Sequence, residues 1–154
     1  MTIEEKLINL LAVRGYRIAA GESCTGGMFT SALIGISGAS KVVDASFVAY
    51  SNDAKCRILG VKPETIKAYG AVSEQTAAEM SEGAARAAGA DIGVGITGFA
   101  DKSGVKSAPA GTVCFGFCVH GFVSTVRVKF DGDRNSVRRQ ATAFALNSLY
   151  SILK

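Results

Sequence analysis

The segment Gly21-Glu22-Ser23-Cys24-Thr25-Gly26-Gly27 constrains the fold more than any other part of this sequence. A short apolar run over residues 16–20 precedes it, and a longer apolar stretch over residues 28–36 follows it. This order predicts a strand, a tight polar turn and then a helix. Such a junction aims backbone N–H groups and small side chains at one point outside a sheet. Ser23 is therefore a candidate nucleophile rather than a core residue.

The rest of the chain alternates helices and strands. Helical periodicity, caps at Thr2, Ser73 and Asp133, and stops at glycines predict helices over residues 3–14, 26–34, 53–59, 63–69, 74–88 and from 134 onward. Apolar runs predict strands over residues 17–21, 45–50, 91–96, 112–119 and 122–130. Gly93 and Gly95 alternate with branched residues, which implies that a helix or a ligand packs very close to that strand.

The connections between these elements predict the topology. Helices separate the first three strands, so these strands should run parallel. His120-Gly121 is a two-residue hairpin turn between the last two strands, which are then antiparallel. The fourth strand opposes all the others. The fold class is α/β: a three-layer α/β/α sandwich with a five-stranded mixed sheet, formed by residues 1–154 as a single domain.

Composition and charge exclude several classes of function. We find no apolar run long enough to span a bilayer and no secretory signal, and the four cysteines lack zinc-type spacing. These features favour a cytoplasmic protein with reduced thiols and no metal. The net charge of +4 is mild and does not indicate nucleic-acid binding. Five basic residues near the C-terminus form either a solvated helix face or a phosphate clamp: Arg127, Lys129, Arg134, Arg138 and Arg139.

A nucleophilic serine needs a base, and the sequence offers two candidates. His120 lies in the hairpin turn, which the topology places at the opposite edge of the sheet. Lys55 follows the second strand and can point back at Ser23, given enough burial to bring its pKa toward neutral. Tyr50 would hold this lysine or shuttle a proton, and N–H groups at the start of the second helix would form an oxyanion hole. The alternative is that Lys55 and Tyr50 are a solvated helical lysine and a sheet-end tyrosine.

Cys24 also has two interpretations. It is either an alternative nucleophile or a small buried residue that fills space at the start of a helix.

Two segments, Glu22-Ser23-Cys24-Thr25-Gly26-Gly27 and Tyr50-Ser51-Asn52-Asp53-Ala54-Lys55, carry a family resemblance. They resemble the signatures of the CinA C-terminal domain family, which includes nicotinamide mononucleotide deamidases. Further similarities lie at residues 70–74, 96–98, 111–113 and 132–141. The resemblance runs essentially end to end. It implies metal-free hydrolysis of nicotinamide mononucleotide to nicotinic acid mononucleotide and ammonia, in pyridine-nucleotide salvage.

The resemblance also assigns roles to individual residues. Ser23 matches the nucleophile of the family, Lys55 its general base and Tyr50 the tyrosine that organises this pair. The residues expected to contact the substrate are Glu22, Cys24, Thr25, Gly26, Gly27, Asn52, Thr97, Gly98, Arg138 and Arg139. Either Arg138 or Arg139 is expected to hold the phosphate together with a helix N-terminus.

One loop departs from the family pattern. Where the family has Ile-Ala-Gly-Pro-Gly-Gly after Thr97-Gly98, this chain has Phe99-Ala100-Asp101-Lys102-Ser103-Gly104, and Ala108 replaces a lysine for which Lys106 is a candidate substitute. We expect this loop to cover the substrate. The departure keeps open an alternative function, a weak or inactive regulatory domain that binds nucleotides. An exposed edge strand also makes a homodimer or higher homo-oligomer plausible.

Overall fold

The computed structural model describes residues 1–101, 105–106 and 108–154 of the chain. Five strands form one sheet in the order β2-β1-β3-β4-β5. Their bounds are β1 Ile18–Glu22, β2 Phe47–Val48, β3 Ile92–Gly98, β4 Thr112–Val119 and β5 Phe122–Lys129. β1 pairs in parallel with β2 and β3, whereas β4 is antiparallel to β3 and to β5. The predicted five-stranded mixed sheet is confirmed.

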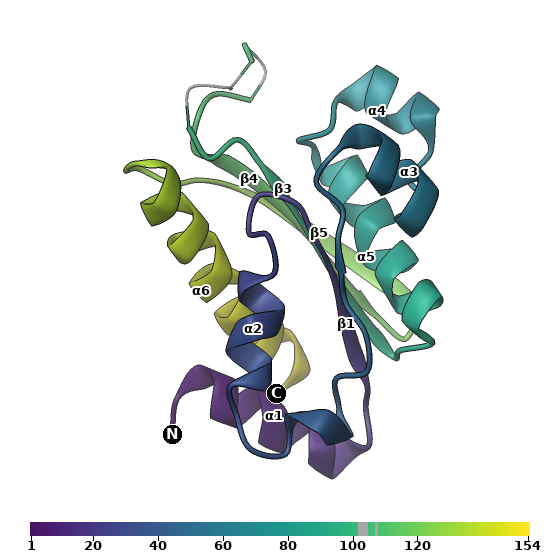
Figure 1. Cartoon of the computed structure of the whole chain (residues 1–154), viewed down its shortest axis with the longest axis vertical. Helices are drawn as coiled ribbons and strands as arrows, with labels where there is room; N and C mark the ends of the chain where they lie inside the picture. Colours follow the sequence, from purple (N-terminus) through teal and green to yellow (C-terminus); the bar gives the residue numbers. More distant parts are fainter. Residues whose placement is uncertain (102–104, 107) are drawn as a thin grey trace.

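Helices cover both faces of this sheet, which gives three layers (Figure 1). The helices are α1 Ile3–Arg14, α2 Met28–Ile34, the 3-10 turn η1 Ala39–Lys41, α3 Asn52–Leu59, α4 Pro63–Tyr69, α5 Glu74–Ala88 and α6 Arg134–Leu153. α1, α2 and α6 lie over one face, and α3, α4 and α5 over the other. The larger core lies on the α1–α2–α6 side and includes Phe29, Phe115 and Leu149, and a smaller core on the other side contains Leu59 and Met80.

α5 packs unusually close to the sheet because three strand positions facing it are glycines. A Cβ at Gly93 would come within 1.9 Å of the Ser81 carbonyl oxygen, and a Cβ at Gly95 or at Gly116 within 2.3 Å of the Ala77 carbonyl oxygen. No side chain fits there. The close neighbour predicted beside the third strand is therefore a helix.

Several element boundaries differ from the prediction by one or more residues, and for α2 and β2 the reason is visible. α2 begins at Met28 rather than at residue 26 because Gly26 and Gly27 have φ of 55° and 102°, outside the right-handed helical region. β2 is only two residues long because the Ser46 hydroxyl, rather than a backbone carbonyl, accepts the hydrogen bond from the Ala20 N–H. The predicted caps at Thr2, Ser73 and Asp133 are present.

β3 is longer than predicted. It continues through Thr97 and Gly98, which the prediction assigned to the following turn. Lys102, Ser103, Gly104 and Ser107 of the loop expected over the substrate lie outside the described residues. No helix within the described part of the chain has the length and apolar character needed to cross a membrane.

Candidate active site

Ser23 lies directly after β1, at the edge of the sheet where β1 and β3 end. Its N–H donates to the Ile96 carbonyl 2.9 Å away, which continues the β1–β3 ladder by one residue. The chain then turns through Gly26 and Gly27 into α2, and their positive φ values allow this reversal. The sheet and the turn together fix the position of the Ser23 hydroxyl just beyond the end of the strand. Ser23 is buried, with 6% of its surface exposed.

Lys55 reaches Ser23 from the other helical layer. The Ser51 hydroxyl caps α3 by accepting from the Ala54 N–H, and Lys55 follows in the first turn of this helix. The Lys55 side chain is buried, and its Nζ lies 3.0 Å from Ser23 Oγ and 3.0 Å from the Tyr50 carbonyl oxygen. Burial lowers the pKa of the Lys55 amine, because the charged form loses its hydration. A buried amine with a lowered pKa beside a hydroxyl can accept its proton.

Tyr50 contributes to this arrangement through its backbone rather than its ring. Its carbonyl oxygen holds the Lys55 amine, whereas the residue is 64% exposed. Arg134, at the start of α6, makes two hydrogen bonds to Asp101, of 2.9 Å and 3.1 Å. Hydrogen bonds to Asp101 and to Tyr50 raise the pKa of Arg134, since they favour the charged guanidinium. Tyr50 therefore joins the Ser23 site to this ion pair.

Glu22 is buried, and its carboxylate accepts hydrogen bonds from groups of the turn and of α2. Its carboxylate accepts from the Thr25 hydroxyl, from the N–H groups of Phe29 and Thr30, and from the Thr30 hydroxyl, at 2.7 to 3.0 Å. α2 has no other side-chain cap, so Glu22 serves as a remote N-cap. The N–H groups of Phe29 and Thr30 are thereby engaged. The expectation of an oxyanion hole at the start of this helix is wrong for these two groups.

One cavity of about 210 Å³ collects seven of the predicted site residues: Ser23, Cys24, Tyr50, Asn52, Lys55, Thr97 and Gly98. Ala71, Val72, Phe99, Ala100 and Arg134 complete its lining among the described residues. The hydroxyl of Thr97 donates to the Ala71 carbonyl, which ties β3 to the segment before α5. Arg134 was one of the five basic residues considered as a phosphate clamp, but it was not among the predicted site residues; its place at the N-terminus of α6 is the signal that distinguishes it.

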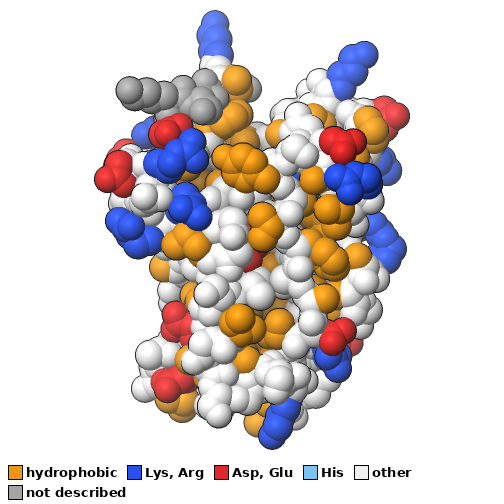
Figure 2. Space-filling view, in the orientation of Figure 1, with side chains coloured by type: hydrophobic (Ala, Val, Ile, Leu, Met, Phe, Trp, Pro, Cys, Tyr) orange, Lys and Arg blue, Asp and Glu red, His pale blue; other side chains and the backbone are white. Residues whose placement is uncertain are grey.

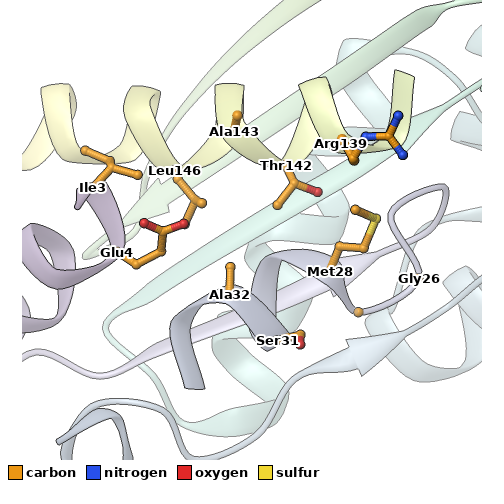
Figure 3. Close-up of a pocket in the computed structure, with 11 residues that line it drawn as sticks. Ile3, Glu4, Gly26, Met28, Ser31, Ala32, Arg139, Thr142, Ala143 and Leu146 are labelled. Carbon is orange, nitrogen blue, oxygen red and sulfur yellow. The ribbon is translucent and has the colours of Figure 1, made fainter. Parts of the chain in front are cut away.

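The two arginines predicted to hold a phosphate lie elsewhere. Arg138 donates through Nε to the Cys24 carbonyl at 2.8 Å, and its Nη2 lies 3.5 Å from the Thr25 carbonyl. Arg138 therefore stabilises the turn by binding its backbone carbonyls. Arg139 lines a separate cavity of about 630 Å³ between α1, α2 and α6, together with Gly26 and Gly27 (Figure 3). Neither arginine lines the Ser23 cavity.

The remaining candidate groups offer no competing chemistry. Burial raises the pKa of the Cys24 thiol to about 11, so the thiol keeps its proton. His120 lies beyond the end of β4, where its ring stacks edge-on against Tyr16 and faces Asp91, at the opposite edge of the sheet from Ser23. Among residues 1–101, 105–106 and 108–154, no cluster of three His, Cys, Asp or Glu side chains is placed to hold a metal ion.

The sequence of this chain is similar to those of known proteins over nearly its whole length. A family model described as the CinA C-terminal domain matches residues 1–153. A CinA-like protein from Kosmotoga olearia is 45% identical over 147 residues, which is 95% of this chain. The chain spans only 36% to 38% of the length of this and two other CinA-like relatives.

Two relatives match over nearly their whole length. Nicotinamide-nucleotide amidohydrolase PncC from Escherichia coli is 43% identical over 152 residues, which cover 97% of this chain and 92% of that protein. The crystal structure of a competence or damage-inducible protein from Enterobacter asburiae superposes with a TM-score of 0.96 at 38% identity, and covers 99% of this chain and 96% of that one.

Proposed function

Because this chain belongs to the CinA C-terminal domain family, we propose that it is an amidohydrolase that hydrolyses nicotinamide mononucleotide. The products are nicotinic acid mononucleotide and ammonia. A relative named nicotinamide-nucleotide amidohydrolase, of similar length and 43% identical, supports the reaction class. The observation that carries the mechanism is the 3.0 Å separation between Lys55 Nζ and Ser23 Oγ in a buried cavity.

In the proposed acylation step, the neutral Lys55 amine takes the proton of the Ser23 hydroxyl as Oγ attacks the carboxamide carbon. The tetrahedral intermediate collapses when the lysine returns this proton to the amide nitrogen. The carbon–nitrogen bond breaks, ammonia leaves, and an ester to Ser23 remains. A Ser–Lys pair is an established variant of the serine–histidine arrangement. The Tyr50 carbonyl helps by holding the amine at 3.0 Å.

In deacylation, Lys55 is again the base, and Ser23 is now the leaving group. Lys55, again neutral, takes a proton from a water molecule that attacks the ester carbon. The carbon–Oγ bond breaks, Ser23 recovers its proton from the lysine, and nicotinic acid mononucleotide forms as the acid, which releases the second proton of the water to solvent and departs as the carboxylate. Each step conserves protons and requires no redox partner and no metal.

We assign the phosphate of the substrate to Arg134 rather than to Arg138 or Arg139. Arg134 lines the Ser23 cavity, whereas Arg138 is engaged with backbone carbonyls and Arg139 lines a different cavity. A guanidinium binds phosphate oxygens through two parallel hydrogen bonds. Basic side chains gather over the upper end of α6 (Figure 2).

A regulatory domain that binds nucleotides without turning them over is the second candidate. Arg134 already carries a carboxylate partner, Asp101, and this pairing favours weaker binding of an anionic substrate. Both candidates predict that nicotinamide mononucleotide raises the melting temperature of the protein by mass action. Only the enzyme releases ammonia.

The test is an ammonia-release assay with nicotinamide mononucleotide on three proteins: unmodified, Ser23→Ala and, as a matched control, Ser37→Ala in an exposed loop. We expect turnover by the unmodified protein and the control, and none above background by Ser23→Ala. Stabilisation without product in the unmodified protein would favour the regulatory domain. Undiminished turnover by Ser23→Ala would reject the mechanism.

Two further expectations accompany the proposed activity. The reaction would serve pyridine-nucleotide salvage, as the family resemblance implies, and the cytoplasm stays the location that the sequence features favour. A homodimer or higher homo-oligomer stays a prediction, and β5 is the surface that supports it, because this edge strand carries Phe122 at 83% exposure.

A further inference from the structure

The ion pair between Asp101 and Arg134 lies on the boundary between two cavities. The Ser23 cavity, of about 210 Å³, is on one side of it. A second cavity of about 510 Å³ lies on the other side, and its lining includes Lys129, Asp101 and Arg134. Ala100 and Arg134 line both cavities, so these two residues and the ion pair form the partition between them.

The inner cavity alone is too small for a mononucleotide. Ligand sites usually occupy roughly 300 to 1,000 Å³, and the inner cavity falls below this range. The reacting carboxamide has to lie beside Ser23, so the ribose and phosphate of a mononucleotide extend toward the cavity mouth. Arg134 stands at that mouth with its guanidinium bound to Asp101.

We propose that Asp101 is a specificity-determining residue whose carboxylate occupies, on Arg134, the position that the phosphate of the substrate takes. The substrate binds by displacing Asp101 from Arg134, and the two cavities then form one site. The nature of the ligand rests on the function proposed above. The competition between Asp101 and a phosphate for Arg134 does not rest on that function, because it is argued from the ion pair and its position between the two cavities.

The energetics allow this exchange. The side chains of Arg134 and Asp101 are 47% and 37% exposed, and ion pairs at such sites are weak. A phosphate monoester carries nearly two negative charges at neutral pH and three acceptor oxygens, whereas a carboxylate carries one charge and two oxygens. Phosphate is therefore the stronger partner for one guanidinium. The ion pair weakens the binding of phosphate-bearing ligands without preventing it.

The test measures binding, so that it does not depend on turnover. Ribose 5-phosphate and ribose are titrated calorimetrically into the unmodified protein and into Asp101→Asn, Arg134→Gln and the double variant. Asp44→Asn is the matched control, since Asp44 is also an exposed aspartate paired with an arginine, Arg17, but at the opposite edge of the sheet. Thermal unfolding verifies that each variant folds, and Asp101→Ser replaces Asp101→Asn if that variant does not.

We expect Asp101→Asn to bind ribose 5-phosphate about two- to five-fold more tightly, the range that exposed ion pairs allow. Ribose binding and the Asp44→Asn control should not change. Arg134→Gln should bind ribose 5-phosphate more weakly, and the double variant should resemble Arg134→Gln, because the proposed competition is for Arg134. Unchanged or weaker binding by Asp101→Asn would overturn the proposal, as would tightening that persists without Arg134. A protein that behaves as expected here but releases no ammonia from nicotinamide mononucleotide would contradict the proposed function alone.

Discussion

Replacing Lys55 by methionine should change activity and stability in different ways. Methionine keeps the length and flexibility of the lysine stem but removes the amine from the buried site. The amine contacts Ser23 Oγ and the Tyr50 carbonyl. The substitution therefore removes the proposed base and also removes a group whose charged form burial disfavours.

The loss of rate follows from the role of a general base. Such a group contributes about 10²- to 10⁴-fold, which corresponds to roughly 3 to 5 kcal/mol of activation free energy at about 1.36 kcal/mol for each factor of ten. The Ser23 hydroxyl stays in place in Lys55→Met, with the Tyr50 carbonyl 3.5 Å away as an acceptor for its proton. Because this acceptor is already present, the fold should survive the substitution.

The effect on stability depends on pH, with a definite sign. The pKa of Lys55 is lowered in the folded protein, whereas in the unfolded chain it is about 10.4. Below the folded pKa both states carry the proton, and folding bears the full cost of burying the charge. Between the two pKa values only the unfolded chain holds the proton, so the free energy of unfolding rises by up to about 1.4 kcal/mol for each pH unit. Lys55→Met lacks this rise.

The assay combines turnover with denaturant unfolding at a series of pH values from about 7 to about 10. The quantity compared is the unfolding free energy of Lys55→Met minus that of the unmodified protein. We expect this difference to fall as pH rises. The buried thiols of Cys24 and Cys114, whose pKa is raised to about 11, titrate in both proteins, so most of their contribution cancels. Lys67→Met, at an exposed position of α4, controls for net charge.

Two results would refute this reasoning. Turnover of Lys55→Met within ten-fold of the unmodified protein would show that Lys55 is not the base. A stability difference independent of pH would show that Lys55 has no lowered pKa in the folded protein.

Two further substitutions test the framework of the site. Gly95→Ala places a Cβ 2.3 Å from the Ala77 carbonyl oxygen and should lower the unfolding free energy by about 1 to 3 kcal/mol, whereas Gly35→Ala, with its nearest neighbour at 3.5 Å, should not. Equal melting temperatures would contradict the close packing of α5. Glu22→Gln places an amide NH2 group against a backbone N–H donor, that of Phe29 or of Thr30, in either orientation of the amide, and should lower both kcat and stability, the latter by about 1 to 3 kcal/mol. Glu5→Gln, in the exposed capping box of α1, is its control, and equal small losses in the two variants would contradict the remote cap.

The sequence predicted the elements well where local signals mark both ends. β4 and α5 have the predicted bounds, because Gly111 and the His120-Gly121 turn flank the strand while Ser73 and Gly89 flank the helix. β2 was overestimated, because a contact between the Ser46 side chain and β1 decides where its ladder ends. Such a contact between distant segments leaves no periodic signal in the sequence.

In the candidate site, too, some contacts could be predicted from the sequence and others could not. The pairing of Ser23 with Lys55 could be predicted because both follow parallel strands, whose carboxyl ends share one edge of the sheet. The choice among the arginines could not, since the direction of each guanidinium depends on how α6 lies against the turn. Glu22 was expected at the substrate, and the structure instead places its carboxylate on the N–H groups of α2. Only the reversal of the chain at Gly26 and Gly27 makes this contact.

The hydrogen bond from Arg138 to the Cys24 carbonyl joins residues 114 positions apart. During synthesis, the turn that carries Ser23 leaves the ribosome long before α6 has been translated. The turn that carries Ser23 consequently lacks the hydrogen bond from Arg138 until α6 docks. Arg134 of the same helix lines the cavity beside Ser23, so the candidate site is complete only once α6 is in place.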